Sequence, residues 1–525
     1  MNICLIVDSE YISKWEYDAI VYAESRSNFK IHSVLFCTNS TSQRRYFKHF
    51  LYFALNLIAM RNQWTKRVAW SNLITDKSYV KKFEAEVNGK WQTIPSEIHA
   101  WLDTSPPDVV LKFGMNLLRD PQKLPSKFGV LSFHHGDPEK FRGRPAGFYE
   151  ILSKAQEIGV IVQRLTNSLD GGEIVSFGAF KIYGHSYKRT LENAYGGGRY
   201  LLLKALNNLD HPLSKDSLGK IYRLPTNLQV VNFFWNVLAN KAKRVIEALL
   251  FRKKWSISTT NQTISGVMES SDLLGDSNIL QTPRNLLFAA DPFLLNDGSI
   301  ICEVVKKSSK VGNLAVVKNG VYEFMDSQAL EQSKHISFPF VANINQSQFL
   351  IPEMASYGQQ HIFEVDKGNQ IIRSIPLKGL ENENLIDPII IVQDGIIWLF
   401  AGKRGSDLDC LFLWSAKSIF EPFVEHRLNP IVCSPKSARN AGAIFNYQGH
   451  LYRPAQNCAG SYGNGISLMR IEVISHFEYV ETLEKTIKFD ESFGPHTINF
   501  AEKVAVFDHY EKVFDPFAWK SKTLF

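Results

Sequence analysis

The chain has 525 residues, of which 45% are hydrophobic and 21% are charged, and its formal net charge is +7. This length exceeds what one hydrophobic core supports, so two or three domains are expected, and the composition excludes disordered and fibrous proteins. A net charge of +7 is small for this length, so the charge does not indicate a nucleic-acid-binding protein.

The six cysteines are scattered, and none forms a CxxC pair. At this density neither a structural zinc site nor a disulfide framework is expected, and we predict no metal. The first residues, MNICLIVDSEY, have no basic segment ahead of the apolar run. We interpret them as a first β-strand rather than a signal peptide, with a cytoplasmic location as the default expectation.

Five short apolar runs alternate with helical patterns between Met1 and Ile182: ICLIV, VLFC, VVLKF, VLSF and GVIVQRL. Strands separated by helices predict a βαβ architecture with a parallel sheet. VDSEY follows the first strand in place of GxGxxG, so a nicotinamide dinucleotide site is not indicated. We therefore predict a Rossmann-like α/β domain over residues 1–185.

Two apolar stretches could either pack inside the protein or contact a membrane. Arg44–Met60 is interrupted by Lys48 and Asn56 and is shorter than the ~20 residues of a membrane span, so we predict a buried helix. Asn232–Trp255 alternates apolar pairs with lysine and arginine, which predicts an amphipathic helix with a basic face.

The second stretch is assigned to a helical connection over residues 186–254. An interdomain helix is the favoured interpretation of this stretch. The alternative is a peripheral membrane contact through residues 232–255, because a membrane-surface anchor has the same pattern. On that alternative the protein would be membrane-peripheral.

After Trp255, short strands separated by Gly, Asn and Asp turns replace the helical pattern. A unit of strand, turn and second strand recurs at intervals of 47 to 54 residues, with starts at Ala290, Ser337, Ile386, Asn440 and Gly494. This interval is typical of four-stranded propeller blades. We predict an all-β five-bladed propeller over residues 255–525, with its last blade completed by strands from Trp255 to Met268. A β-sandwich with chance alternation is the alternative.

The first domain carries a candidate acid–base pair at two strand ends. In SFHHGDPEKFRGRPAGFYE, His134 ends a strand and precedes a glycine-rich bend, and in QRLTNSLDGGEIV, Asp170 lies in a turn after another strand. A histidine and an aspartate so placed suit general acid–base catalysis. Histidines at strand ends often only cap a loop, so the residues alone leave both interpretations open.

Both segments resemble the folate-dependent formyltransferases, the family of methionyl-tRNA formyltransferase and the sugar N-formyltransferases. Ser132-Phe133-His134 corresponds to that family's Asn-x-His, Arg142-Gly143 to its Arg-Gly bend, and residues 169–174 to its Leu-Asp-x-Gly-x-Ile turn. His134 and Asp170 are 36 residues apart, as in the family. The resemblance covers residues 1–185 and is strongest from Asp108 to Val175.

This resemblance implies transfer of a formyl group from 10-formyltetrahydrofolate to an amine, without a metal. His134 would handle the proton and Asp170 would hold the imidazole. Ser132 stands where the family has its catalytic asparagine, and loss of an oxyanion donor commonly costs ~100–1000-fold in rate. On this resemblance, His135 or the backbone after Phe133 would be the substitute donor, and the alternative is that the activity has been lost. The implied folate-binding residues are Phe113, Gly114, Arg142 and Gly143.

A second candidate site follows from the repeats, because equivalent strand ends of a closed propeller meet near its axis. Facing carboxylates shift their pKa values apart, which assigns acid and base roles. The alternative is that Asp-Pro and Pro-Glu merely form turns. The predicted pocket residues are Asp291, Glu303, Glu353, Asp387, Arg439, Arg453 and His496.

Two resemblances concern this second domain. ADPF at residues 290–293 resembles the five-bladed propellers of a glycoside hydrolase clan, such as arabinanases and fructosidases, which implies catalytic aspartates at Asp291 and Asp387. The combination of FPF, IPE, RxAG, LYRPAQ and GPHT resembles more closely the domain that precedes the glycosyltransferase in plant glucosamine inositolphosphorylceramide transferases.

The leading functional prediction is formylation of an amino sugar in bacterial glycan biosynthesis. The propeller would bind the carbohydrate or a nucleotide- or lipid-linked carrier, and no nucleic acid is expected as a partner. One alternative makes the propeller a glycan-processing domain beside a degenerate formyltransferase domain. The other is a non-catalytic glycan-binding protein.

Overall fold

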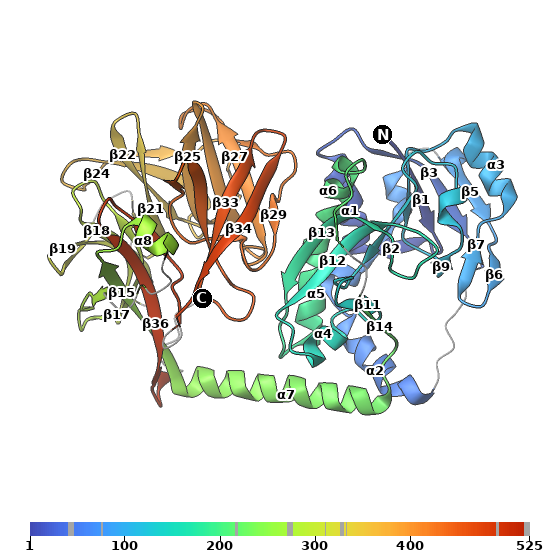
Figure 1. Cartoon of the computed structure of the whole chain (residues 1–525), viewed down its shortest axis with the longest axis horizontal. Coiled ribbons are helices and arrows are strands. Elements are labelled where there is room, and N and C mark those ends of the chain that lie inside the picture. Colours follow the sequence, from blue (N-terminus) through green and yellow to red (C-terminus); the bar gives the residue numbers. More distant parts are fainter. Residues whose placement is uncertain are drawn as a thin grey trace. The chain divides into compact units, whose positions relative to one another are not determined.

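The computed structural model describes residues 1–39, 47–74, 77–215, 219–269, 273, 277–309, 311–325, 330–331, 333–489 and 493–518. These residues form two compact units, Met1–Lys241 and Ala242–Phe525 (Figure 1). We predicted boundaries at residues 185 and 255. Much of the predicted connection instead packs within the first unit, because α5 (Tyr187–Gly198) and α6 (Leu201–Asn207) contact its central sheet.

A seven-stranded sheet forms the core of the first unit, in the order β13-β12-β10-β8-β1-β3-β5. Its strands are β1 (Asn2–Val7), β3 (Lys30–Cys37), β5 (Val80–Phe83), β8 (Val109–Lys112), β10 (Val130–His134), β12 (Glu157–Arg164) and β13 (Glu173–Lys181). All five apolar runs that predicted strands are confirmed. The prediction of a parallel sheet is wrong at one edge, because β12 is antiparallel to β10 and β13 is antiparallel to β12. A buried strand has the same apolar pattern in either direction, so the sequence does not encode this difference.

Short elements complete the first unit. Its helices are α1 (Lys14–Glu24), α2 (Phe50–Ala59), α3 (Ser96–Thr104), α4 (Phe148–Leu152), α5 and α6. Its small sheets pair β2 (Tyr11–Ser13) with β4 (Arg67–Ala69), β11 (Phe141–Gly143) with β14 (Lys220–Tyr222), and β7 (Trp91–Thr93) with β6 (Glu86–Asn88) and β9 (Leu117–Leu118). The β11–β14 pair ties residues beyond 186 to the candidate site.

The predicted buried helix at Arg44–Met60 is α2, and its burial is wrong. Only Tyr52 and Ala59 of α2 are buried, whereas Phe50, Leu57 and Ile58 are exposed. Residues 44–46 lie outside the described residues. Apolar composition predicted the helix correctly, but burial depends on what packs against it.

The amphipathic helix is confirmed as α7 (Asn227–Leu250), which buries Val230 and Phe233. It ends at Leu250, five residues before the predicted end, because β15 (Phe251–Thr260) begins there and pairs along its length with β36 (Ala505–Phe514). Among the described residues, no helix is long and apolar enough to cross a membrane.

The described part of the second unit forms five antiparallel sheets. The first has β17 (Leu286–Leu294), β18 (Ile300–Lys306), β19 (Gly312–Lys318) and β20 (Val321–Phe324), and the second has β21 (Ser337–Ile344), β22 (Ser347–Glu353), β23 (His361–Val365) and β24 (Ile371–Pro376). The third has β25 (Leu385–Gln393), β26 (Ile396–Lys403), β27 (Cys410–Ala416), β28 (Val424–Glu425) and β29 (Val432–Cys433). The fourth has β30 (Arg439–Asn440), β31 (Phe445–Tyr447), β32 (His450–Gln456), β33 (Ile466–Ile474) and β34 (Tyr479–Ile487). The fifth has β35 (Ile498–Phe500), β36, β15 and β16 (Ser277–Ile279).

Each predicted repeat supplies consecutive strands of one sheet, so the repeat itself is confirmed, although β30, β31 and β35 are short. The fifth sheet is completed by β15 as expected, but α8 (Ile264–Glu269) is a helix where a strand was expected. Neighbouring sheets touch through their first strands: β17 contacts β21, β21 contacts β25, and β25 contacts β30. The backbone N–H of Ile498 donates to Ala441 O at 2.8 Å, and β35 contacts β17. Contacts therefore run from each sheet to the next and from the fifth back to the first.

Candidate functional site

In the first unit, the predicted pair lies together. His134 Nδ1 is 3.4 Å from Asp170 Oδ1, although the two residues come from the end of β10 and the turn between β12 and β13. The backbone N–H of Gly143 donates to Asp170 Oδ2 at 2.8 Å, and Arg142 donates to Leu169 O. The three segments that carry the formyltransferase resemblance therefore meet at one place. The catalytic roles of these residues stay a prediction.

The other residues predicted for this site lie beside the pair. Ser132 Oγ is 3.5 Å from Phe133 O, the limit for a hydrogen bond. Phe113 stacks on Phe133 with ring centroids 5.9 Å apart. A Cβ on Gly114 would lie 2.5 Å from the Asp8 backbone nitrogen, so the close strand approach requires glycine there. Binding of 10-formyltetrahydrofolate at these residues stays a prediction.

His135 is held in an aromatic group rather than beside a carboxylate. Its ring lies 5.0 Å from that of Trp15 and 4.7 Å from that of Tyr195. Burial, with a smaller contribution from the charge of His134, lowers the pKa of His135 to about 3. The ring is therefore neutral, and its Nε2 has no hydrogen-bond partner among the described residues.

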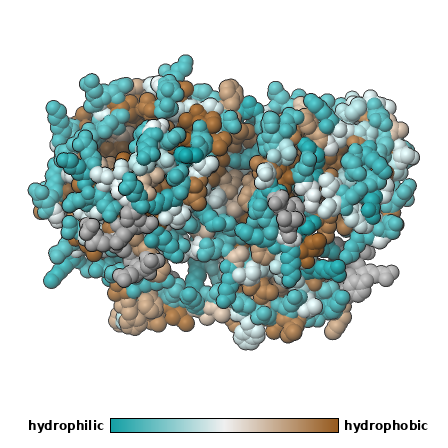
Figure 2. Space-filling model, viewed as in Figure 1, coloured by the Kyte–Doolittle hydropathy of each residue, from teal (hydrophilic) through white to brown (hydrophobic). Residues whose placement is uncertain are grey.

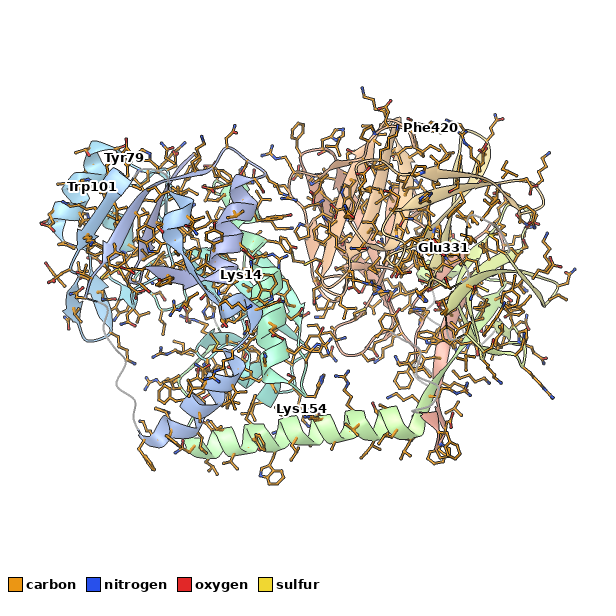
Figure 3. All side chains as sticks on the ribbon, turned by 180° about the vertical axis from the view of Figure 1, so that it is seen from behind. Lys14, Tyr79, Trp101, Lys154, Glu331 and Phe420 are labelled. Carbon is orange, nitrogen blue, oxygen red and sulfur yellow. The ribbon has the colours of Figure 1, made fainter. Side chains whose placement is uncertain are left out.

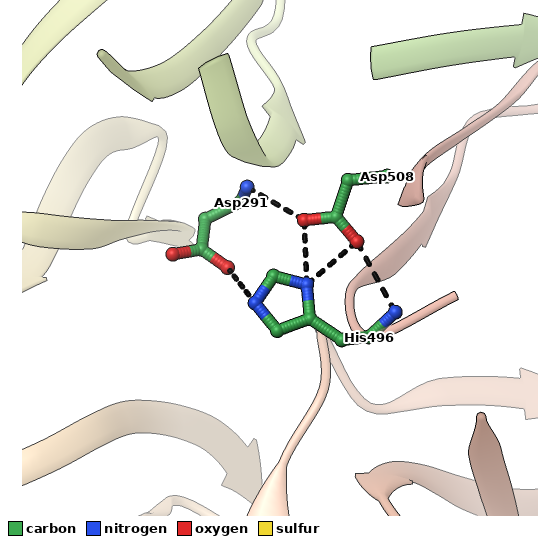
Figure 4. A group of neighbouring side chains, drawn as sticks. All are labelled: Asp291, His496 and Asp508. Atoms are coloured by element: carbon green, nitrogen blue, oxygen red, sulfur yellow. Dashed lines mark hydrogen bonds and ion pairs between the residues drawn. The ribbon is translucent and has the colours of Figure 1, made fainter. Parts of the chain in front are cut away.

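In the second unit, a buried carboxylate–histidine cluster joins the first and fifth sheets (Figure 4). It consists of Asp291, His496 and Asp508, and each is at least nine-tenths buried. His496 Nδ1 lies 2.7 Å from the Asp508 carboxylate, and His496 Nε2 lies 3.4 Å from Asp291 Oδ1. The Thr497 hydroxyl donates to Asp291 Oδ1 at 2.8 Å, and the Asp291 backbone N–H donates to Asp508 Oδ2 at 2.9 Å. The imidazole is thus clamped between two carboxylates.

A second group joins the third and fourth sheets. Arg439 Nε lies 2.6 Å from Asp387 Oδ2, and its Nη1 lies 2.6 Å from Asp407 Oδ2. Gln456 Nε2 donates to Asp387 Oδ2 at 3.1 Å, and the Asn440 amide donates to the Asp387 carbonyl at 2.8 Å. Asp387 is therefore fixed by three side chains of the neighbouring sheet.

Glu303 and Glu353 occupy equivalent places on the second strands of sheets one and two. In the strand registers, Glu303 is opposite Ala290 and Glu353 is opposite Ser337. Glu353 hydrogen-bonds to Asp387, whereas Glu303 Oε1 has no hydrogen-bond partner among the described residues. Burial and the neighbouring acids raise the pKa of both glutamates well above the usual value.

The carboxylate–histidine cluster shifts the pKa of its own members. Burial, reinforced by Asp508 and Asp387 and opposed by His496, raises the pKa of Asp291 to about 6. Burial alone would lower the pKa of His496, but the charges of Asp508 and Asp291 outweigh it and raise the pKa. A carboxyl with a pKa of about 6, beside glutamates whose pKa values are also raised, is an arrangement that suits acid–base chemistry.

Backbone bulges aim these side chains. Asp291, Phe338 and Asp387 have φ values of 52°, 44° and 46°, which lie in the left-handed region. Each immediately precedes a proline, and at each the register with the next strand shifts. A bulge adds a residue to one strand and turns its side chain out of the regular alternation. The same bulge, at a residue that precedes a proline, thus recurs in the first three sheets.

Arg453 is separate from the rest of the predicted pocket. It is fully buried, and its Nη2 lies 2.7 Å from Glu481 Oε1 within the fourth sheet. Gln456 is the residue opposite Arg439 in the strand register, so it, rather than Arg453, occupies the place equivalent to Glu303. Register counting from the repeat could have found Gln456. Asp407 lies in a turn outside the repeat, and no sequence signal marked it.

The carboxylate–histidine cluster also has the composition of a metal site. One donor atom from each of Asp291, His496 and Asp508 lies within 4.8 Å of the others. Both ring nitrogens of His496 already face carboxylates, so a cation would have to replace at least one of these contacts. The prediction of no metal stays a prediction.

Comparison with known proteins finds two kinds of similarity. Residues 272–499 match the family model described as "Glucosamine inositolphosphorylceramide transferase 1, N-terminal". The glucosamine inositolphosphorylceramide transferase 1 of Oryza sativa subsp. japonica is 33% identical over 212 residues, which cover 37% of this chain and 27% of the relative. That of Arabidopsis thaliana is 31% identical over 215 residues, with the same coverage. The chain thus spans about a quarter of the length of these relatives.

The methionyl-tRNA formyltransferase of Wolbachia sp. subsp. Drosophila simulans is 33% identical over 106 residues, which cover 20% of this chain and 35% of the relative. Among solved structures, glycinamide ribonucleotide transformylase 1 from Symbiobacterium toebii aligns with a TM-score of 0.28 at 15% identity, covering 43% of this chain and 94% of its own. A thermostable family-43 glycoside hydrolase aligns with a TM-score of 0.29 at 10% identity, covering 38% of this chain and 76% of its own.

These comparisons correct the predicted function. We predicted formyl transfer to an amino sugar, but the family model and the three plant relatives that match are glucosamine inositolphosphorylceramide transferases. The main prediction is therefore wrong, and the alternative, in which the second unit carries the glycan-related function, fits better. The plant relatives and the methionyl-tRNA formyltransferase are all transferases by name.

Proposed function

We propose that the second unit is a five-bladed β-propeller that binds a carbohydrate at its centre and acts there on a glycosidic linkage. One observation carries the proposal: ionisable side chains from all five sheets form one polar network, and all of them except Arg439 are buried. Asp291, Glu353, Asp387, Arg439 and His496 come from sheets one to five in that order. The closed sequence of contacts between sheets supports the propeller arrangement.

The proposed chemistry divides acid and base roles between two carboxyl groups. Burial and the neighbouring acids raise the pKa of Glu303 well above its usual value, which favours the protonated form that can donate a proton to the oxygen of a leaving group. Asp291, with a pKa of about 6, is ionised at neutral pH and can accept a proton or stabilise a positive charge on the sugar. His496 positions Asp291 from the other side.

The acceptor groups of the network favour an amino sugar over an anionic group. Four carboxyl groups, Asp291, Glu303, Glu353 and Asp387, line the network and accept hydrogen bonds whether ionised or protonated, whereas Arg439 is already engaged by Asp387 and Asp407. An ammonium group on a hydroxyl-rich ring would complement this excess of acids. Asp407 and His335, with side chains 20% and 30% exposed, lie at the more open edge of the network, which is the proposed entrance.

The proposal treats the first unit as a degenerate formyltransferase-like domain. By resemblance, Ser132 stands where the family has its catalytic asparagine. Its hydroxyl contacts only weakly the carbonyl of the next residue.

The test uses the full-length protein and glucosaminyl-inositol phosphate, free and as the glycolipid. Calorimetry measures binding, and mass spectrometry detects cleavage or transfer of the glucosamine. Glu303→Gln should lower turnover by about 100-fold or more while binding is retained. Asp387→Asn should weaken binding, and Asp394→Asn, in an exposed hairpin turn, is the matched control. Binding without turnover by the wild type would make the propeller a glycan-binding domain, and absence of binding to either probe would refute the proposal.

A further inference from the structure

Helix α7 exposes a continuous apolar stripe. Leu228, Val231, Trp235, Leu238, Ala242, Val245 and Leu249 follow one another at alternating spacings of three and four residues. Such residues share one face of a helix. The stripe is open to solvent: Leu228 is 79% exposed and Trp235 is 63% exposed. Phe234 and Ile246 widen it, at 61% and 52% exposure.

The figures show the same surface from two sides. Hydrophobic side chains gather along the lower edge in Figure 2, where Figure 1 places α7. Seen from behind in Figure 3, side chains of α7 project outward from the ribbon.

Further apolar groups lie next to the first turns of α7, within the first unit. The Asn227 side chain accepts from the Leu51 backbone N–H at 3.0 Å and donates to Phe47 O, so α2 is joined to the start of α7. Phe47 and Phe50 are 86% and 58% exposed. An exposed apolar surface of this extent, on two adjoining elements, indicates a binding partner.

The charges around the stripe are almost all positive. Between Asn227 and Lys254 the chain has six lysine and arginine residues and a single acid, Glu247, which pairs with Lys512 at 3.0 Å. At about 100° per residue, Lys241 and Lys243 fall on the two borders of the stripe. Both are exposed. An apolar face with aromatic residues and basic borders is the composition of helices that lie in the headgroup region of anionic membranes.

We propose that the α7 stripe, together with Phe47 and Phe50, docks on the surface of an anionic lipid bilayer. The aromatic and aliphatic side chains enter the headgroup region, and the bordering lysines contact acidic headgroups. Lys241, Lys243, Arg244 and Glu247 interrupt the second half of α7, so the helix lies along the membrane surface. This inference is independent of the glycan-binding proposal for the second unit.

A second copy of the chain is the competing occupant, because the three–four spacing also suits a helix pair. Two observations favour the bilayer. Pairing two copies would bring their basic borders together, and like charges at such positions repel. A partner helix on the stripe would also leave Phe47 and Phe50 uncovered, whereas a lipid surface accommodates both elements.

Vesicle co-sedimentation of the full-length protein tests the inference. The wild type should bind phosphatidylcholine vesicles that contain about 30 mol% phosphatidylserine several-fold more tightly than pure phosphatidylcholine vesicles. The double variant Phe234→Ser/Trp235→Ser should lose about tenfold or more in affinity. Lys241→Gln/Lys243→Gln should lose about fivefold per charge on the anionic vesicles alone.

Matched control variants distinguish binding through this surface from nonspecific adsorption to vesicles. Phe477→Ser and Lys367→Gln/Lys378→Gln change equally exposed residues elsewhere, and binding should be unchanged. Lipids brominated in their acyl chains should quench part of the wild-type tryptophan fluorescence, and Trp235→Phe should remove that part while binding persists. Equal binding by wild type and Phe234→Ser/Trp235→Ser would overturn the proposal. A dimer in sedimentation velocity that this double variant abolishes, without vesicle binding, would assign the stripe to a second copy.

Discussion

Replacing Asp291 by asparagine should change how the stability of the second unit depends on pH. Burial raises the pKa of Asp291 from 3.8 to about 6. Between these two values the folded protein binds more protons than the unfolded chain, so the wild type loses stability as the pH rises from about 4 to about 6. A shift of about two units corresponds to at most about 3 kcal/mol.

The amide in the Asp291→Asn variant carries no charge in either state, so the variant should lack this loss. The free energy of unfolding of Asp291→Asn minus that of the wild type should therefore rise by up to about 3 kcal/mol between pH 4 and pH 6.5. Any constant effect of the amide on the contacts with Thr497 and His496 cancels in this difference.

The assay is urea unfolding at several pH values, combined with hydrogen exchange of the peptides that cover β17 and β36. Peptide-level exchange is needed because two units do not unfold as one two-state system. Asp297→Asn is the control of opposite sign. Contacts with Ser299, Lys318 and Asn369 outweigh burial and hold the pKa of Asp297 below its usual value. Its stabilising contribution is present above the unfolded pKa and is lost in acid, so this variant should be most destabilised at the higher pH. A pH-independent difference for Asp291→Asn would refute the reasoning about the buried cluster.

Two further predictions concern the architecture of the second unit. Glu481→Gln leaves the fully buried Arg453 without its counter-charge and should lower the free energy of unfolding by about 3–5 kcal/mol. Glu484 lies on the same strand but is more exposed, so Glu484→Gln should change this free energy little. Calorimetry of both variants checks the prediction. Gly442→Ala should cost about 3 kcal/mol or more, because φ is 144° and a Cβ would lie 2.0 Å from Ile498 O. Gly395→Ala also has a positive φ but meets open space, so its melting temperature should fall much less, and equal losses in the two glycine variants would contradict the contact between the fourth and fifth sheets.

Local patterns in the sequence were sufficient for most elements. The recurrence at Ala290, Ser337 and Ile386 predicted β17, β21 and β25, because strand, turn and strand alternate with a period that short segments carry by themselves. The five apolar runs of the first unit predicted five of the seven strands of its central sheet for the same reason. The direction of β12 was not predictable, since a strand buried on both faces has no signature of direction.

The sequence also failed to predict which helices are buried. The composition of Phe50–Ala59 predicted a helix, but only the packed structure shows that Phe50, Leu57 and Ile58 face outward. Whether a residue is buried depends on which other segments pack against it, and the sequence of α2 alone does not specify those segments.

For the candidate sites too, the sequence determined some features and the tertiary structure determined others. The sequence by itself determined that His134 ends one strand, that Asp170 lies in a turn after another, and that Asp291 and Asp387 hold equivalent places in a repeat. Only the tertiary structure decided which partners they meet. Gln456, rather than Arg453, reaches Asp387, because Gln456 lies opposite Arg439 in the strand register, whereas Arg453 pairs with Glu481 within the fourth sheet. Asp407 joins Arg439 from a turn outside the repeat, and such a contact exists only once distant segments have packed together.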